Sequence, residues 1–294
     1  LVTRSVSLAG KEEREEKEIY YSQNILSSIS FLCLDGHGDN SMLTCIIICV
    51  GGRMKIAVIT AMPEETAAVL KKASNSEKRR QDGRMIIHGR LFGHDVLLAE
   101  SGMGMLNAGW GAAALTDKGV DLIISAGFGG AVKSGLQVGN VVMARNILQL
   151  HGNDLETVCV GFYGQNSIAE SLSLPLGTFI SCDTILNKRD LAGLLPDECT
   201  NPVVEMETAA IARVAAQHGI PFLALRSISD PWDEELDFSI DEFCDDSMQI
   251  RIPKVLRTIA QRPHIIPQLI RLARNSRIAA KALSTAMEQL LKQI

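Results

Sequence analysis

The chain has 294 residues, of which 46% are hydrophobic, and its formal net charge at pH 7 is −5. A chain of this length and composition buries one large core, which excludes an intrinsically disordered protein. Its apolar runs stay well short of the roughly 18 residues that a membrane-spanning helix needs, so the sequence predicts no such helix.

The seven cysteines stand at scattered positions, with neither metal-ligand spacing nor the framework of a disulfide-rich protein: 33, 45, 49, 159, 182, 199 and 244. This usage is typical of a reducing compartment, and we expect a cytoplasmic protein. The histidines show no spacing that would bring two of them together as metal ligands. We therefore expect no metal and no other cofactor.

Residues 1–53 lack the pattern of a folded domain. They begin with Leu1, pass through a charged cluster over residues 11–18 and show no sustained hydrophobic period. The strand pattern begins only at Met54, so we predict an N-terminal extension outside the fold and a single domain over residues 54–294. We hypothesise that the native chain starts at Met54, and a genuine extension that packs poorly is the alternative.

The first predicted strand covers residues 55–60 and is followed at once by a helix. Pro63 suits the first turn of that helix, where its missing N–H costs nothing. The turn after Met62 therefore places Glu64 and Glu65 at a helix N-terminus and at the carboxyl end of a buried strand. A carboxylate in this place often does no more than offset the helix dipole, which is the structural alternative for both glutamates.

Apolar runs separated by glycine turns predict further strands over residues 84–90, 94–101, 121–132 and 139–144. The stretch 121–132 is interpreted as a buried strand that ends in a glycine turn. Between these strands, residues 105–116 form a predicted helix entered through Gly102-Met103-Gly104. A lone G-x-G lacks the third glycine of a dinucleotide fingerprint and the lysine of a P-loop. We interpret it as a tight turn that lets a ligand approach the backbone.

The stretch from Val203 to Asp230 is the most informative part of the chain. Residues 208–217 predict a nearly buried helix, which Gly219 ends. Residues 222–225 predict a short strand covered on both faces. Ligands of an open α/β sheet bind at the carboxyl ends of its strands. Polar residues follow this strand there: Arg226, Ser227, Ser229 and Asp230.

Two carboxylates, Glu205 and Glu207, precede the predicted helix, and Asp230 follows the strand. Each has a structural interpretation that involves no ligand. Glu207 could simply satisfy the free N–H groups at the helix start. Asp230 precedes a proline and could be a turn residue.

The V-E-M-E-T-A-A and R-S-I-S-D segments together resemble the purine nucleoside phosphorylase superfamily, and within it the 5′-methylthioadenosine/S-adenosylhomocysteine nucleosidase branch. The resemblance implies that the Met206 backbone and Glu207 hold the ribose hydroxyls. It implies that Asp230 protonates the leaving purine. The turn A-M-P-E-E is similar to that of the same branch, which implies that Glu65 activates water.

Residues 178–187 (TFISCDTILN) resemble the segment of this branch that reads the base. The resemblance implies backbone contacts from Leu186 and an orienting role for Asp183. Ile185 stands where the branch has an aromatic residue that stacks on the purine. Phe128 stands where a small residue is usual, so the chain departs from the pattern at both places.

The C-terminal tail is basic although the chain is acidic overall. Residues 251–294 hold nine Lys or Arg and one acid. Beyond Pro267, apolar residues recur at helical spacing and predict a helix with one apolar face and one basic face. The apolar positions are Leu269, Ala273, Ala280, Leu283, Met287, Leu290 and Ile294. We expect this helix to pack on its own domain or on a dimer mate. Peripheral contact of the tail over residues 264–294 with a membrane is the alternative. The segment R-P-H-I-I-P-Q-L-I-R-L-A-R resembles the end of the adenosylhopane nucleosidases, whose substrate is a lipid carrying adenosine.

These patterns predict a single α/β domain with a central mixed, twisted sheet flanked by helices, similar to nucleoside phosphorylases. We expect it to hydrolyse the N-glycosidic bond of a small adenosine-type nucleoside and to form a homodimer. Asp230 is the predicted acid and Glu65 the predicted base. Arg226 is predicted to orient Glu65 and the water.

Other functions stay open at this point. A phosphorylase would share the fold and Asp230 but use phosphate in place of water. A nucleosidase acting on a lipid such as adenosylhopane, or a nucleoside-binding protein without catalysis, would keep the pocket. Nucleic-acid binding is not expected, because the basic tail lacks interleaved aromatic residues and the rest of the chain is acidic.

Overall fold

The computed structural model describes residues 52–81, 83–184, 187–234, 243 and 252–294. The predicted extension over residues 1–53 lies outside this part of the chain, apart from its last two residues. The strands are β1 (Lys55–Thr60), β2 (Ser74–Gln81), β3 (Arg84–Leu91), β4 (His94–Glu100), β5 (Leu122–Ala131), β6 (Val141–His151), β7 (Asp154–Thr157), β8 (Leu176–Ser181), β9 (Val203–Glu205) and β10 (Phe222–Asp230). The helices are α2 (Pro63–Val69), α3 (Met105–Thr116), α4 (Gln165–Ser171), α5 (Lys188–Leu194), α6 (Thr208–Gln217), α7 (Ile252–Gln261) and α8 (Ile266–Gln293), with short 3₁₀ turns η1 (Leu70–Lys72) and η3 (Pro263–Ile265).

The strands form one mixed sheet in the order β10-β6-β8-β9-β5-β1-β4-β3-β2, with β7 paired to β6. Strand β5 pairs with β10 as well as with β9 and β1. Five strands therefore close into a ring, in the order β10, β6, β8, β9 and β5. Parallel pairs join β1 to β4 and β5, whereas β3 and β6 run antiparallel to their neighbours β4 and β10. The prediction of a mixed sheet in one α/β domain is confirmed.

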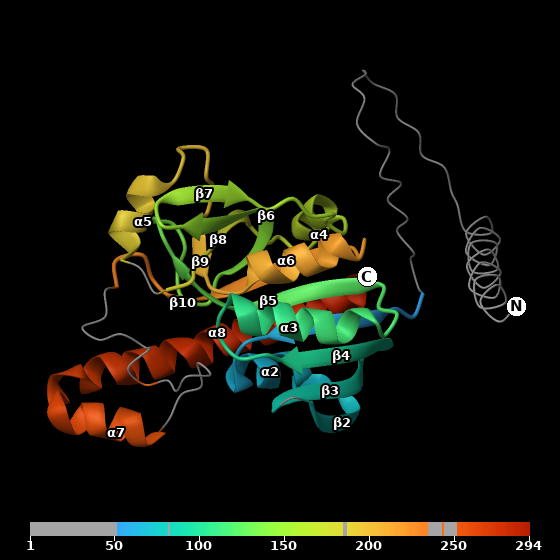
Figure 1. Cartoon of the computed structure of the whole chain (residues 1–294), viewed down its shortest axis with the longest axis horizontal. Helices are drawn as coiled ribbons and strands as arrows, with labels where there is room; N and C mark the ends of the chain where they lie inside the picture. Colours follow the sequence, from blue (N-terminus) through green and yellow to red (C-terminus); the bar gives the residue numbers. More distant parts are fainter. Residues whose placement is uncertain (1–51, 82, 185–186, 235–242, 244–251) are drawn as a thin grey trace, which may run out of the picture. The chain divides into compact units, whose positions relative to one another are not determined.

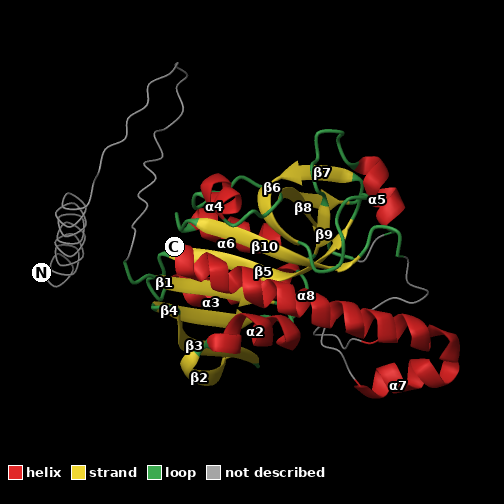
Figure 2. Cartoon of the chain, turned by 180° about the vertical axis from the view of Figure 1, so that it is seen from behind, coloured by secondary structure: helices red, strands yellow, loops and turns green. Residues whose placement is uncertain are grey.

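Helices cover the sheet around β1 on two faces, as Figures 1 and 2 show. Successive residues of β1 point to opposite faces. Ile56 and Val58 pack into a core with α2 and the second half of α8, whereas Ala57 and Ile59 pack into another with α3 and α6. Both faces of β1 are buried, which explains why its sequence is a continuous apolar run.

Two strands continue where the sequence predicted that they would end, one through a polar stretch and one through a glycine-rich stretch. Strand β10 does not stop at Leu225 but continues through the polar residues to Asp230. Strand β5 likewise contains its glycines instead of ending in a glycine turn. The reason is common to both, because the parallel pairing of β10 with β5 runs from Phe222 to Asp230 and holds the two segments extended.

The C-terminal helix α8 divides into two halves. From Ala279 to Leu291 its apolar side chains are buried in the domain's own core, in contact with α2. Ala273, predicted on the apolar face, is exposed, as are Ile270 and Ile278 in the first half. Packing on its own domain is thus confirmed for the second half. None of the described helices has both the length and the apolar character needed to cross a membrane.

Candidate active site

Glu65 lies in the first turn of α2, directly after β1. Its carboxylate accepts three backbone hydrogen bonds, at Oε2 from Ala61 (2.8 Å) and Met62 (2.9 Å) and at Oε1 from Phe128 (2.7 Å). Pro63 opens the helix, so the sequence places Glu65 where the free N–H groups of a helix start are found. Glu65 is only 3% exposed. The site thus contains a buried carboxylate at the end of β1 that backbone groups hold in place.

The glycines of β5 make room for two carboxylates. A Cβ on Gly127 would lie 2.8 Å from Glu65 Oε1, and a Cβ on Gly130 would overlap Asp230 Oδ2. The two glycines are three positions apart in the strand, a distance of about 10 Å. Glu65 and Asp230, which are far apart in sequence, therefore both lie directly against the backbone of β5.

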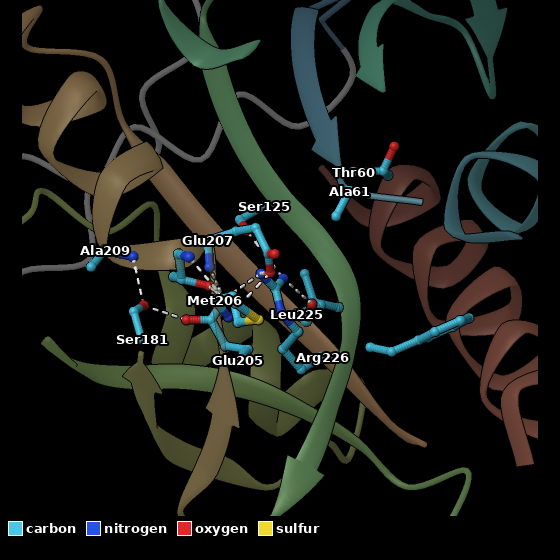
Figure 3. A network of polar contacts seen from close by, with 12 residues as sticks. Thr60, Ala61, Ser125, Ser181, Glu205, Met206, Glu207, Ala209, Leu225 and Arg226 are labelled. Carbon is cyan, nitrogen blue, oxygen red and sulfur yellow. Dashed lines mark hydrogen bonds and ion pairs between the residues drawn. The ribbon is translucent and has the colours of Figure 1, made fainter. Parts of the chain in front are cut away.

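Arg226 occupies the middle of β10 and connects the carboxylates that precede α6, as Figure 3 shows. Its Nη2 lies 2.6 Å from Glu205 Oε2 and 3.7 Å from Glu207 Oε2. Its Nη1 donates to Ser125 Oγ and to the Leu225 carbonyl, both at 3.1 Å. The guanidinium is thus buried against two carboxylates and fixed from two strands.

Glu205, and not Glu207, satisfies the start of α6. Its Oε2 accepts hydrogen bonds from the N–H groups of Glu207 (3.0 Å) and Thr208 (2.8 Å) and from the Thr208 hydroxyl (2.6 Å). Its Oε1 accepts a short hydrogen bond from Ser181, whose oxygen in turn accepts from the N–H of Ala209. Figure 3 shows this chain of contacts. The interpretation of Glu207 as a helix cap is therefore wrong.

Glu207 turns toward the loop before α3 instead. Its Oε1 accepts a hydrogen bond from Gly104 N at 3.0 Å, and its Oε2 accepts one from Met206 N at 3.3 Å. Gly104 has a φ of 92°, a left-handed value that favours glycine. The Gly102-Met103-Gly104 turn thus presents backbone to a carboxylate of the site.

Burial raises the pKa of Glu65, and the Arg226 charge and the three backbone N–H groups offset this only in part. Burial, followed by repulsion from Glu205, raises the pKa of Glu207 to about 7. Burial also opposes the charge of Glu205, but Arg226 and the hydroxyls of Ser181 and Thr208 outweigh it and lower the pKa of Glu205. Glu205 is therefore the ionised partner of Arg226, whereas the pKa values of Glu65 and Glu207 are both raised.

Arg226 was predicted to orient Glu65, but the structure shows no hydrogen bond between these two side chains among the described residues. The hydrogen bonds of the Arg226 guanidinium go to Glu205, Ser125 and the Leu225 carbonyl, because these groups surround it in the core. Arg226 influences Glu65 through its charge. Backbone N–H groups take over the orientation of the Glu65 carboxylate.

Asp230 is the last residue of β10 and lies in a strand, so its interpretation as a turn residue is wrong. Its Oδ1 accepts a hydrogen bond from Ser229 Oγ at 2.7 Å. Its Oδ2 forms an ion pair with Lys188 at the start of α5. The Asp230 side chain is 30% exposed, so it is partly open to solvent.

Most of the predicted site residues come together in two groups. The first group surrounds the turns after β1 and β9 and consists of Met62, Glu65, Met206, Glu207 and Arg226. Ser229 and Asp230 lie beside Gly130 at the end of β10. Of the predicted base-reading segment, Ile185 and Leu186 lie outside the described residues, and Asp183 is exposed.

Sequence reasoning gave no role to four residues that build these groups. Ser125 and Ser181 each interrupt an apolar run, and a polar residue inside a buried strand is a signal that could have identified them. Glu205 was visible as the first carboxylate of V-E-M-E. Lys188 carries no signal, because only the fold brings it to Asp230.

In the described ranges, no group of three or more His, Cys, Asp or Glu side chains is placed to hold a metal ion.

Comparison with known proteins points to one family for this chain. The model of the phosphorylase superfamily matches residues 55–261. A 5′-methylthioadenosine/S-adenosylhomocysteine nucleosidase of Exiguobacterium is 29% identical over 233 residues, which cover 71% of this chain and 98% of the relative. That of Geobacillus thermodenitrificans is 31% identical over 217 residues, which cover 65% of this chain and 89% of the relative.

Solved structures share the fold. The 5′-methylthioadenosine/S-adenosylhomocysteine nucleosidase of S. pneumoniae, solved with a transition-state inhibitor, matches with a TM-score of 0.61 and 25% identity. The match covers 81% of this chain and 99% of that protein. The similarity therefore extends over nearly the whole length of the relatives.

Proposed function

The chain belongs to the phosphorylase superfamily, and we propose that it is a nucleosidase that hydrolyses the N-glycosidic bond of an adenosine-type nucleoside. The proposed substrates are those of its relatives, 5′-methylthioadenosine and S-adenosylhomocysteine. The observation that carries the proposal is the pair of carboxylates against β5, with Glu65 buried at one end and Asp230 partly open at the other.

Breaking the C1′–N9 bond of a nucleoside builds positive charge on the sugar and negative charge on the base. The reaction therefore needs an acid at the base and a base that prepares water at the sugar. Asp230 takes the first role, since its carboxyl group is accessible at the strand end. Glu65 takes the second, because its raised pKa makes it a better proton acceptor than an ordinary carboxylate once it is ionised.

The ribose would lie between these two carboxylates, against the glycines of β5. Glu207 and the Met206 backbone then hold the ribose hydroxyls, since these two residues form the turn between β9 and α6. Arg226 acts at a distance, because its charge faces both Glu65 and Glu207 while its guanidinium is buried. Ser229 supports Asp230 through its hydroxyl.

Phosphorolysis is disfavoured by the turn after β1. A phosphate site needs free backbone N–H groups. Here the N–H groups of Ala61, Met62 and Phe128 already donate to Glu65. A phosphate placed about 5 Å from that carboxylate would meet a repulsion of roughly 3 kcal/mol per charge pair at an effective dielectric of about 20.

A panel of adenosine derivatives, assayed for free adenine, tests the proposal. We expect methylthioadenosine and adenosylhomocysteine to be cleaved, and binding without base release would contradict a nucleosidase. Adenosine-bearing lipid belongs in the panel because the first half of α8 is exposed, although its second half is buried in the domain's own core. The homodimer, the cytoplasmic location and the membrane contact stay predictions from the sequence.

A further inference from the structure

Lys188 stands against Asp230, the residue to which the proposed function assigns protonation of the base. Its Nζ forms an ion pair with Asp230 Oδ2 and donates to the carbonyl oxygen of Pro231 at 2.6 Å. A longer contact reaches the carbonyl of Asp230 at 3.4 Å. The Lys188 side chain is 10% exposed and comes from the first turn of α5, so the contact joins two elements that are distant in sequence.

The protein uses every donor of the Lys188 ammonium. An ammonium carries three N–H donors and no acceptor. Three oxygens surround it, namely Asp230 Oδ2, the Asp230 carbonyl and the Pro231 carbonyl. The ammonium has no donor left for a substrate, and its contacts go to Asp230 and to the residue after it.

Strand β5 leaves room for this pair. A Cβ on Gly130 would overlap Asp230 Oδ2 and lie 3.1 Å from Lys188 Cε. On the other side of the carboxylate, Ser229 Oγ donates to Oδ1 at 2.7 Å. Asp230 is thus held on both oxygens while its side chain is partly open to solvent.

We propose that Lys188 is a positioning residue for the leaving-group acid, an inference that rests on the proposed function. When the C1′–N9 bond breaks, its electron pair stays on the base, and N7 of the base takes a proton from Asp230. The oxygen of water bonds to C1′, and the proton that water loses goes to Glu65. Lys188 neither gains nor loses a proton, but its ammonium aims the Asp230 carboxyl group and stabilises the carboxylate left after transfer.

A double-mutant cycle in kcat with methylthioadenosine tests this role. Lys188→Met should lower kcat by about 10²-fold, as expected when a reacting group is misplaced, and should leave KM within about threefold. The matched control is Lys71→Met, an exposed lysine on η1, which should leave both constants unchanged. In an Asp230→Asn background, Lys188→Met should have no further effect, because the group through which it acts is already lost.

The outcomes separate the two proposals. If Asp230→Asn is as active as the wild type, the acid of the proposed function is wrong. If Asp230→Asn loses activity but Lys188→Met does not, only the role of Lys188 is wrong. If the two losses multiply in the double variant, Lys188 has a structural role unrelated to Asp230, which also contradicts the proposal. Should Lys188→Met fail to fold, as judged by thermal unfolding, Lys188→Gln takes its place with the same expectations.

Discussion

The two carboxylates beside β5 are supported in opposite ways. Glu65 is buried and receives three hydrogen bonds from backbone N–H groups. Asp230 is partly open and is held by two side chains, Ser229 and Lys188. Backbone support makes Glu65 part of the fold itself, whereas Asp230 depends on partners that substitution can remove. The same chemical group should therefore respond differently to the same kind of substitution at the two positions.

The largest effect is expected from removing either carboxylate. Asp230→Asn and Glu65→Gln should each lower kcat by about 10²–10⁴-fold, the range of general acid–base catalysis. Only Glu65→Gln should also destabilise the fold, by about 1–3 kcal/mol, because the amide NH₂ would face backbone N–H donors. Steady-state kinetics and urea unfolding measure the two effects. Turnover of Asp230→Asn within a few-fold of the wild type would make Asp230 a structural residue.

The cation beside the Glu65 side of the site should matter for stability as well. Arg226→Met removes the partner of a buried Glu205 and should lower the free energy of unfolding by about 3–5 kcal/mol. Arg79→Met is the matched control, because Arg79 pairs with Glu77 on the exposed strand β2 and its loss should cost no more than about 1 kcal/mol. Equal losses in urea unfolding would show that the buried cluster does not depend on its arginine.

Glu207 should make the stability of the fold depend on pH. Its pKa is raised to about 7 in the fold from an ordinary 4.5, so the unfolded chain releases this proton first. Stability conferred by the protonated form is complete below pH 4.5, falls as the pH rises toward 7 and is constant above. Glu207→Gln should remove the part of the decline that Glu207 causes, up to about 3 kcal/mol in the free energy of unfolding between pH 4.5 and 7.5, and leave the part that the raised pKa of Glu65 causes. The free energy of unfolding is measured by urea unfolding at a series of pH values. The same dependence on pH in the variant and in the wild type would contradict the raised pKa of Glu207.

The two glycines should sharpen the comparison further. In Gly127→Ala the new Cβ meets Glu65 Oε1 at 2.8 Å, and the three backbone bonds leave that carboxylate nowhere to move. We expect kcat/KM to fall by about 10²-fold. In Gly130→Ala the carboxylate is held by side chains that can shift, so the loss should be smaller. A larger loss for Gly130→Ala would reverse the comparison.

The sequence predicted the parts of the site that local chemistry determines. Pro63 after an apolar run marks both the end of β1 and the helix start that holds Glu65, and the structure has them there. The helices over residues 105–116 and 208–217 have the predicted bounds, and glycines mark the start of the first and the end of the second. In each case the signal lies within a few residues of the feature.

Features set by contacts between distant segments were not predictable. Strand β2 has no apolar residue and is exposed throughout, so only its pairing with β3 defines it. The polar end of β10 is a strand because β5 lies beside it. The capping role of Glu205 and the approach of Lys188 to Asp230 likewise follow from the assembled sheet.

The central claim is that Glu65 activates water at a turn that cannot accept phosphate. The most direct test is to analyse the sugar product from methylthioadenosine in buffer with and without inorganic phosphate. We predict the same rate of adenine release in both buffers and a free methylthioribose product. A sugar 1-phosphate, or a rate that rises from zero as phosphate is added, would contradict the assignment of Glu65.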